Sequence, residues 1–138
     1  MASRGSVLVV DDNRDSRDLL AELLAFDGFE VTTAVTGVEA VEVTEQHRPQ
    51  VVLMDLALPG VMDGWEATRR IKNDPRLRNT IVIAVTAHAY PEHKQRAIHA
   101  GCQAVFTKPY DLPALVAHVE KVFRQRTRTS GDSGDAAE

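Results

Sequence analysis

Residues 51–64 read VVLMDLALPGVMDG, and their pattern predicts a strand, a loop and the start of a helix in succession. Four apolar residues run directly into Asp55, as expected of a strand that is covered on both faces. Pro59-Gly60 then marks a loop, and Gly64 opens a segment with helical character that runs to Asn73. A buried strand, a polar residue at its end, a loop and a helix form one unit of a parallel α/β sheet.

The same alternation of strand and helix extends outward in both directions. Strand-like runs occupy residues 6–10, 30–34, 80–85 and 103–107, and helical patterns occupy residues 13–27, 37–47, 91–100 and 111–126. Five such units predict an α/β domain with a parallel sheet and helices on both faces. We expect residues 6–126 to form this domain, residues 1–5 to be an N-terminal extension, and residues 127–138, rich in Ser, Gly, Asp and Ala, to be a disordered tail.

Composition limits the class of protein. The 138 residues are 43% hydrophobic and 26% charged, with a net charge of -4, so an excess of Lys and Arg that would favour nucleic acid or an anionic membrane is absent. A single cysteine excludes an internal disulfide, and no apolar run approaches the ~18 residues of a membrane span. These features are typical of a cytoplasmic domain that binds neither nucleic acid nor membrane.

Polar residues follow four of the five predicted strands. Asp11-Asp12 follow the first strand, Asp55 the third, Thr86 the fourth and Lys108 the fifth. Parallel strands present their carboxyl ends at one edge of the sheet, where ligands of such folds bind. We therefore expect three carboxylates, a hydroxyl and an ammonium group to converge there.

Three clustered carboxylates repel one another by ~1 kcal/mol per pair in water, and by more when partly buried. A hard divalent cation, Mg²⁺ or Mn²⁺, would offset this repulsion. A carboxylate beside a metal ion, the Lys108 ammonium and the Thr86 hydroxyl is suited to attack phosphorus. The pattern predicts that one of these carboxylates becomes an aspartyl phosphate.

The segments LVVDDN, VVLMDLALPGVMDG, IVIAVTAHA and VFTKPY together resemble the landmarks of the response-regulator receiver domain, the CheY-like family. The resemblance covers residues 6–126. It implies a flavodoxin-like, doubly wound five-stranded parallel sheet with strand order 2-1-3-4-5.

The resemblance also implies a function. Asp55 would take a phosphoryl group from a phosphohistidine of a sensor histidine kinase or a histidine phosphotransfer protein. The chain would then be a stand-alone phosphorylation switch of a two-component system or phosphorelay that signals to a downstream protein target by contact. It would be no enzyme beyond catalysing its own phosphorylation and autodephosphorylation.

Roles for individual residues follow from the same resemblance. Asp12, Asp55 and the backbone carbonyl of Ala57 would bind Mg²⁺, and Asp11 would position the ion through water. Thr86 and Lys108 would contact the phosphoryl oxygens, and the Lys108-Pro109 peptide bond would be cis.

The sequence departs from the family pattern in two places. The loop PGVMDG is one residue longer than the commoner form, and Val105 stands where receivers usually carry Tyr or Phe. Phe106 is one residue later and is expected on the opposite face of the sheet. The resemblance further implies that Ala57 and His88 would occupy positions that tune the lifetime of the phosphoryl group.

Two alternatives remain at this stage. The first is a Mg²⁺-dependent aspartyl-phosphate hydrolase of the haloacid-dehalogenase type, whose nucleophile follows the first strand in an Asp-x-Asp motif. Here that position reads Asp11-Asp12-Asn13, and we expect neither a cap domain nor an output domain beyond residue 126. The second is a degenerate receiver that acts only as an interaction module. A variant of the leading interpretation is that the chain is a receiver segment from a hybrid kinase. Labelling by a small phosphodonor distinguishes the phosphorylation switch from the aspartyl-phosphate hydrolase and from the interaction module.

Overall fold

Five strands and five α-helices alternate along the chain. The computed structural model describes residues 3–87 and 90–136, with side chains as far as Arg126. The strands are β1 (Ser6–Val10), β2 (Glu30–Ala34), β3 (Val51–Asp55), β4 (Ile81–Thr86) and β5 (Cys102–Thr107). The helices are α1 (Arg14–Phe26), α2 (Gly37–His47), α3 (Gly64–Asn73), α4 (Pro91–Ala100) and α5 (Leu112–Ala136), with a short 3-10 helix η1 (Pro75–Leu77).

All five strands pair in parallel, in the order β2-β1-β3-β4-β5, which confirms the predicted topology. In the register of the central strands, Val10 of β1 lies opposite Met54 of β3, and Asp55 lies opposite Val85 of β4. The residues that follow β1 therefore lie beside the end of β3. This register sets the geometry of the candidate site.

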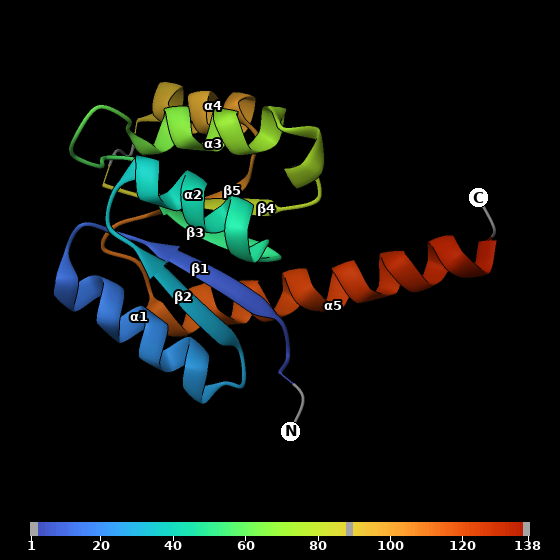
Figure 1. The fold of residues 1–138 in the computed structure, drawn as a ribbon. Helices are drawn as coiled ribbons and strands as arrows, with labels where there is room; N and C mark the ends of the chain where they lie inside the picture. The colour runs from blue at the N-terminus through green and yellow to red at the C-terminus, as the bar shows by residue number, and fades with distance from the viewer. Residues whose placement is uncertain (1–2, 88–89, 137–138) are drawn as a thin grey trace.

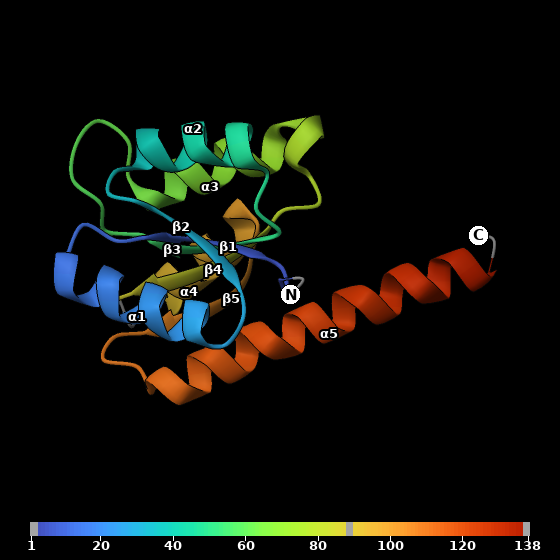
Figure 2. The ribbon, with the colours of Figure 1, turned by 60° about the horizontal axis from the view of Figure 1, so that its bottom comes forward.

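The helices cover both faces of the sheet (Figures 1 and 2). Helices α2, α3 and α4 cover one face, where Leu8, Val52 and Val82 pack with Ile71 of α3. Helices α1 and α5 cover the other face. There the alternate strand residues, which point away from the first face, pack with Leu24 of α1 and with Leu115, Val119 and Val122 of α5. Alternate residues of each strand thus enter two separate cores, which explains the continuous apolar runs in the sequence.

Helix α5 is longer than the sequence predicted. It runs to Ala136, whereas we expected an end near Arg126. Figure 2 shows its second half leaving the body of the domain. The side chains of residues 127–138 lie outside the described part of the chain, and the disordered tail stays a prediction.

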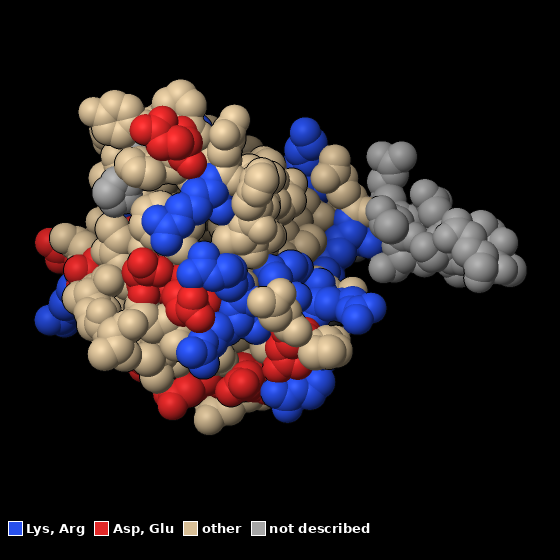
Figure 3. All heavy atoms as spheres, turned by 90° about the horizontal axis from the view of Figure 1, so that it is seen from above, with Lys and Arg blue, Asp and Glu red and all other residues tan. Residues whose placement is uncertain are grey.

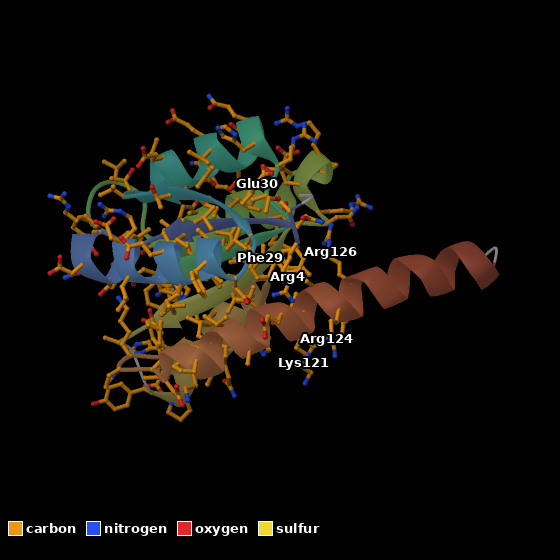
Figure 4. All side chains as sticks on the ribbon, turned by 90° about the horizontal axis from the view of Figure 1, so that it is seen from below. Arg4, Phe29, Glu30, Lys121, Arg124 and Arg126 are labelled. Carbon is orange, nitrogen blue, oxygen red and sulfur yellow. The ribbon has the colours of Figure 1, made fainter. Side chains whose placement is uncertain are left out.

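The N-terminal segment is held against α5 by one arginine. The Arg4 guanidinium donates to Asp27 Oδ2 at 2.9 Å and to Glu120 Oε2 at 3.1 Å, and its Cζ lies 5.0 Å from the centre of the Phe29 ring. The Phe29 ring packs in turn on Phe123 of α5, with 4.9 Å between ring centres. Figure 4 shows Arg4 and Phe29 beside α5. Residues 1–5, expected to be an extension, therefore include a packed residue.

Figure 3 shows Lys and Arg side chains next to Asp and Glu side chains on the face seen from above. Ion pairs at the surface of the domain join Glu66 to Arg69 and Arg70, and Arg76 to Glu45 and Asp74. Each pair is solvent-exposed on at least one side, so each contributes at most about 1 kcal/mol. Among the described residues, no helix has both the length and the apolar character needed to cross a bilayer.

Candidate functional site

The acidic residues that follow β1 and β3 meet at the carboxyl edge of the sheet. Asp11 and Asp55 are 6% and 5% exposed, and Asp12 is exposed to solvent. One carboxylate oxygen from each of the three residues lies within 4.8 Å of the others. The predicted acidic cluster is therefore present, and it arises because β1 and β3 are neighbours in the sheet.

Lys108 joins the cluster from the end of β5. Its Nζ lies 3.1 Å from Asp11 Oδ2 and 3.1 Å from Asp55 Oδ2, and it donates to both. The Lys108 backbone N–H donates to the carbonyl oxygen of Thr86 at 2.7 Å, which ties the end of β5 to the end of β4. The Lys108-Pro109 bond is cis, as the resemblance implied.

The second oxygen of each buried carboxylate accepts a backbone N–H. Asn13 N–H donates to Asp11 Oδ1 at 2.9 Å, and Ala57 N–H donates to Asp55 Oδ1 at 3.0 Å. Asn13 also caps α1, since its side-chain oxygen accepts from Ser16 N–H at 2.9 Å. The loop after each strand therefore fixes the rotamer of the acid that precedes it.

Burial and charge act in opposite directions on these groups. Burial raises the pKa of the Asp55 carboxyl, and the Ala57 N–H and the Lys108 ammonium offset only part of this rise. Burial alone would lower the pKa of Lys108, but the carboxylates of Asp55 and Asp11 outweigh it and raise that pKa. The protonated amine is thus stabilised by two carboxylates, while the ionised form of Asp55 is costly to bury.

The remaining predicted residues lie at the same edge or outside the described chain. Thr86 ends β4 and is 1% exposed, and Ala57 is exposed in the loop after β3. His88 lies outside the described residues. The predicted switch position, Val105, packs on the α2, α3 and α4 side of the sheet, whereas Phe106 packs on the α1 and α5 side.

Three features of the site were missed from the sequence. Gly64 begins α3 so close to β3 that an added Cβ would lie 2.5 Å from Leu56 Cα and closer still to the Asp55 carbonyl oxygen. Arg17 Nη1 donates to the Asp11 carbonyl oxygen at 3.0 Å from one turn into α1. The glycine of the Met-Asp-Gly segment was the available signal for the first contact; nothing local to α1 signalled the second.

The third missed feature is a groove of about 510 Å³ beside Lys108. Leu19 of α1 and Tyr110 are among the residues that line it, and burial raises the pKa of the Tyr110 hydroxyl. The groove joins α1 to the segment after β5, two regions that are far apart in the sequence.

The acidic cluster fits a hard divalent cation. Its donors are carboxylate oxygens, the preferred ligands of Mg²⁺ and Ca²⁺. Two oxygens on one octahedral Mg²⁺ are at most about 4.2 Å apart, and the three carboxylates are already within 4.8 Å of one another. Asp12 faces solvent, where a hydrated ion could reach it.

Comparisons with known proteins agree with this geometry. The sequence model described as the response regulator receiver domain matches residues 7–120. The polar-differentiation response regulator DivK of Brucella anthropi is 36% identical over 115 residues, which cover 83% of this chain and 93% of that protein.

Solved receiver domains share the fold. The CheY-like receiver domain protein of Methanospirillum hungatei JF-1 has a TM-score of 0.84 at 26% identity, covering 91% of this chain and 98% of that one. The receiver domain of a signal transduction histidine kinase from Syntrophus aciditrophicus has a TM-score of 0.80 at 29% identity, covering 88% and 91%. With its strand order, its acidic edge and these matches, the chain belongs to the response regulator receiver domain family of two-component signalling.

Proposed function

We propose that Asp55 is the phosphoacceptor of this receiver and that the chain works as a phosphorylation switch. One observation carries the proposal: a single ammonium group, Lys108 Nζ, contacts both buried carboxylates at the edge where β1, β3 and β5 end. A structural ion pair needs one acid and one base. Two buried acids sharing one lysine, with a third acid alongside, leave negative charge that a ligand must balance.

The phosphoryl donor is a phosphohistidine on a sensor histidine kinase or a histidine phosphotransfer protein, as in the family generally. An Asp55 carboxylate oxygen attacks phosphorus, and the O–P bond forms as the P–N bond to the donor imidazole breaks. The bonding electron pair leaves with the imidazole nitrogen, which takes up a proton. Charge on the equatorial oxygens is then balanced by the Lys108 ammonium and a hydrogen bond from the Thr86 hydroxyl.

A divalent metal ion, Mg²⁺ or Mn²⁺, supplies further charge neutralisation when it is bound. Asp12, Asp55 and the Ala57 carbonyl are its proposed direct ligands. Asp11 is proposed to position the ion through water, as the resemblance to the receiver family implies. The exposure of Asp12 supports entry of the ion from solvent.

The remaining functional expectations rest on the family. We propose that the phosphorylated chain signals to a downstream protein by contact and that its chemistry is limited to its own phosphorylation and autodephosphorylation. The match to the receiver family and the strand order favour this reading over the haloacid-dehalogenase type. The degenerate interaction module differs from it in one testable respect, the modification of Asp55.

Incubation with acetyl phosphate or phosphoramidate tests the proposal. We expect intact-protein mass spectrometry to show a gain of one phosphoryl group in the presence of Mg²⁺ and little or none in EDTA. Asp55→Asn should remove the gain, and the matched control Asp18→Asn, on the exposed face of α1, should keep it. Undiminished labelling of Asp55→Asn would place the acceptor elsewhere, and no labelling of the wild type would favour the interaction module.

A further inference from the structure

The one tryptophan of the chain, Trp65, lies in the first turn of α3, directly after the glycine that touches the acceptor strand. Gly64 has no room for a side chain against the backbone of Asp55 and Leu56, and its N–H donates to the Leu56 carbonyl oxygen at 3.0 Å. A displacement of the backbone after β3 therefore has to move the start of α3. Trp65 is 7% exposed and moves with that turn.

On its other side, Trp65 contacts α4. The Cζ atom of Arg96 lies 4.2 Å from the centre of the Trp65 ring, and the His93 ring centre lies 6.1 Å away. His93 in turn meets Tyr90, at the start of α4, edge to face with 5.8 Å between ring centres. Helices α3 and α4 run side by side on the same face of the sheet (Figure 1). Trp65 thus follows the glycine that abuts the acceptor strand, and its ring contacts α4.

The residue that would link Thr86 to this face by an aromatic ring is absent. Val105 occupies that position on β5, and its side chain packs with the core under α2, α3 and α4. The ring of Phe106 faces the other way and lies edge to face with His118 of α5, with 5.2 Å between ring centres. The aromatic contact with α4 is instead made by Trp65, in the first turn of α3.

From these contacts we infer that Trp65 and Arg96 are positioning residues, which set the position of α4 according to the state of Asp55. The inference rests on the proposed function, because it needs two states of the acceptor. Packed helices shift between discrete arrangements, so a small backbone change at residues 55–57 can be passed on as a shift of α4. The stacked guanidinium is the part of the contact that lies at the surface and can be altered without opening the core.

Amide hydrogen exchange of residues 91–100 measures this coupling. The acceptor is compared in Mg²⁺ alone and in Mg²⁺ with beryllium fluoride, an analogue of the phosphoryl group. In the wild type we expect the exchange rate of α4 to differ between the two states. Arg96→Gln should reduce the ratio of the α4 exchange rates in the two states by about two- to five-fold, which is the factor that corresponds to an exposed cation–π contact. Arg96→Lys should restore most of this ratio. Trp65→Phe, which keeps a ring in the core, should reduce the ratio in the same direction.

Lys94→Gln is the matched control, since Lys94 is an exposed cation on the same helix. It should behave as the wild type, and acetyl phosphate labelling of Asp55 should be unchanged in every variant. With normal labelling, the inference is wrong if both Arg96→Gln and Trp65→Phe keep the full difference in α4 exchange rate between the two states. It is also wrong if Lys94→Gln reduces this difference as much as Arg96→Gln does. A variant that changes the exchange rate by the same factor in both states would indicate a purely structural role and would likewise overturn the inference. Loss of labelling in the wild type would instead overturn the proposed function, and the inference with it.

Discussion

Replacing Asp55 by asparagine should stabilise the metal-free protein, although the residue is the proposed acceptor. The Asp55 carboxylate gains about 5 kcal/mol of attraction from Lys108 at 3.1 Å, for an effective dielectric constant of about 20. Asp11 and Asp12, with oxygens within 4.8 Å, oppose this by about 3.5 kcal/mol for the buried acid and about 1 kcal/mol for the exposed one. The Coulomb contributions nearly cancel.

The largest remaining contribution is the cost of burying an ionised carboxylate that is 5% exposed, which amounts to several kcal/mol. The smaller cost of burying the asparagine amide in the variant has to be subtracted from it. An asparagine side chain can still accept from the Ala57 N–H. We therefore expect Asp55→Asn to raise the free energy of unfolding by about 1–3 kcal/mol at neutral pH in EDTA. Urea unfolding followed by circular dichroism would show this as a midpoint shift of about 1 M.

The pH dependence of the gain follows from the raised pKa of Asp55. The unfolded chain keeps the ordinary value of 3.8, whereas the folded protein holds this proton more tightly. The wild type therefore loses stability relative to Asp55→Asn as the pH rises through the folded-state pKa, and the gap closes as the pH falls toward 3.8. Asp18→Asn, at an exposed position on α1, should show no such gap.

Mg²⁺ should reduce the difference in the free energy of unfolding between Asp55→Asn and the wild type, because it should stabilise the wild type more. An ion at ten times its dissociation constant stabilises the wild type by about 1.4 kcal/mol, and the variant, which lacks one proposed ligand, should gain less. If Asp55→Asn is less stable than the wild type in EDTA, burial of the ionised Asp55 carboxylate does not destabilise the metal-free protein. Equal stabilisation of both proteins by Mg²⁺ would contradict the proposed role of Asp55 as a metal ligand.

Four further changes test other parts of the structure. Lys108→Met removes the shared ammonium and should slow acetyl phosphate labelling by about a hundredfold, measured by intact mass over time. Gly64→Ala places a methyl group against the β3 backbone and should lower the free energy of unfolding by about 1–3 kcal/mol, measured by urea unfolding. Arg4→Ala removes two part-exposed ion pairs and a ring contact and should cost about 1 kcal/mol in the same assay. A chain that ends at Arg126 should keep the labelling rate and the unfolding midpoint of the full chain; a large loss in either would extend the domain into residues 127–138.

The convergence of the site could be predicted because it depends on topology alone. Once the strands are parallel, Asp11, Asp55, Thr86 and Lys108 must leave the sheet at one edge, whatever their loops do. The alternation of side chains likewise separates Val105 from Phe106 by face, and the structure confirms that separation. Features that follow from the period of the backbone can be inferred from sequence without knowledge of packing.

Features that depend on helix-to-helix packing could not be predicted in this way. Arg96 meets Trp65 from 31 positions along the chain, and only the relative placement of α3 and α4 brings the two together. Arg4 reaches Glu120 across nearly the whole sequence. We expected α5 to end near Arg126 because the residues that follow, Gly131 and Gly134 among them, have weak helix propensity, whereas the helix continues to Ala136.

The charges of the site also indicate why metal and phosphoryl group should depend on each other. Three carboxylates and one lysine leave about two negative charges at the edge, and a divalent cation would bring the sum near zero. The proposed phosphorylation of Asp55 would replace its single negative charge by up to about two. The modified site therefore needs the cation more than the unmodified one does, since without it about three negative charges would be crowded together. Linkage requires the effect to be mutual: if the cation favours the phosphorylated state, phosphorylation must tighten cation binding by the same factor. In this arrangement Lys108 neutralises part of the charge of the unphosphorylated site, and the metal ion would balance the negative charge that a phosphoryl group adds.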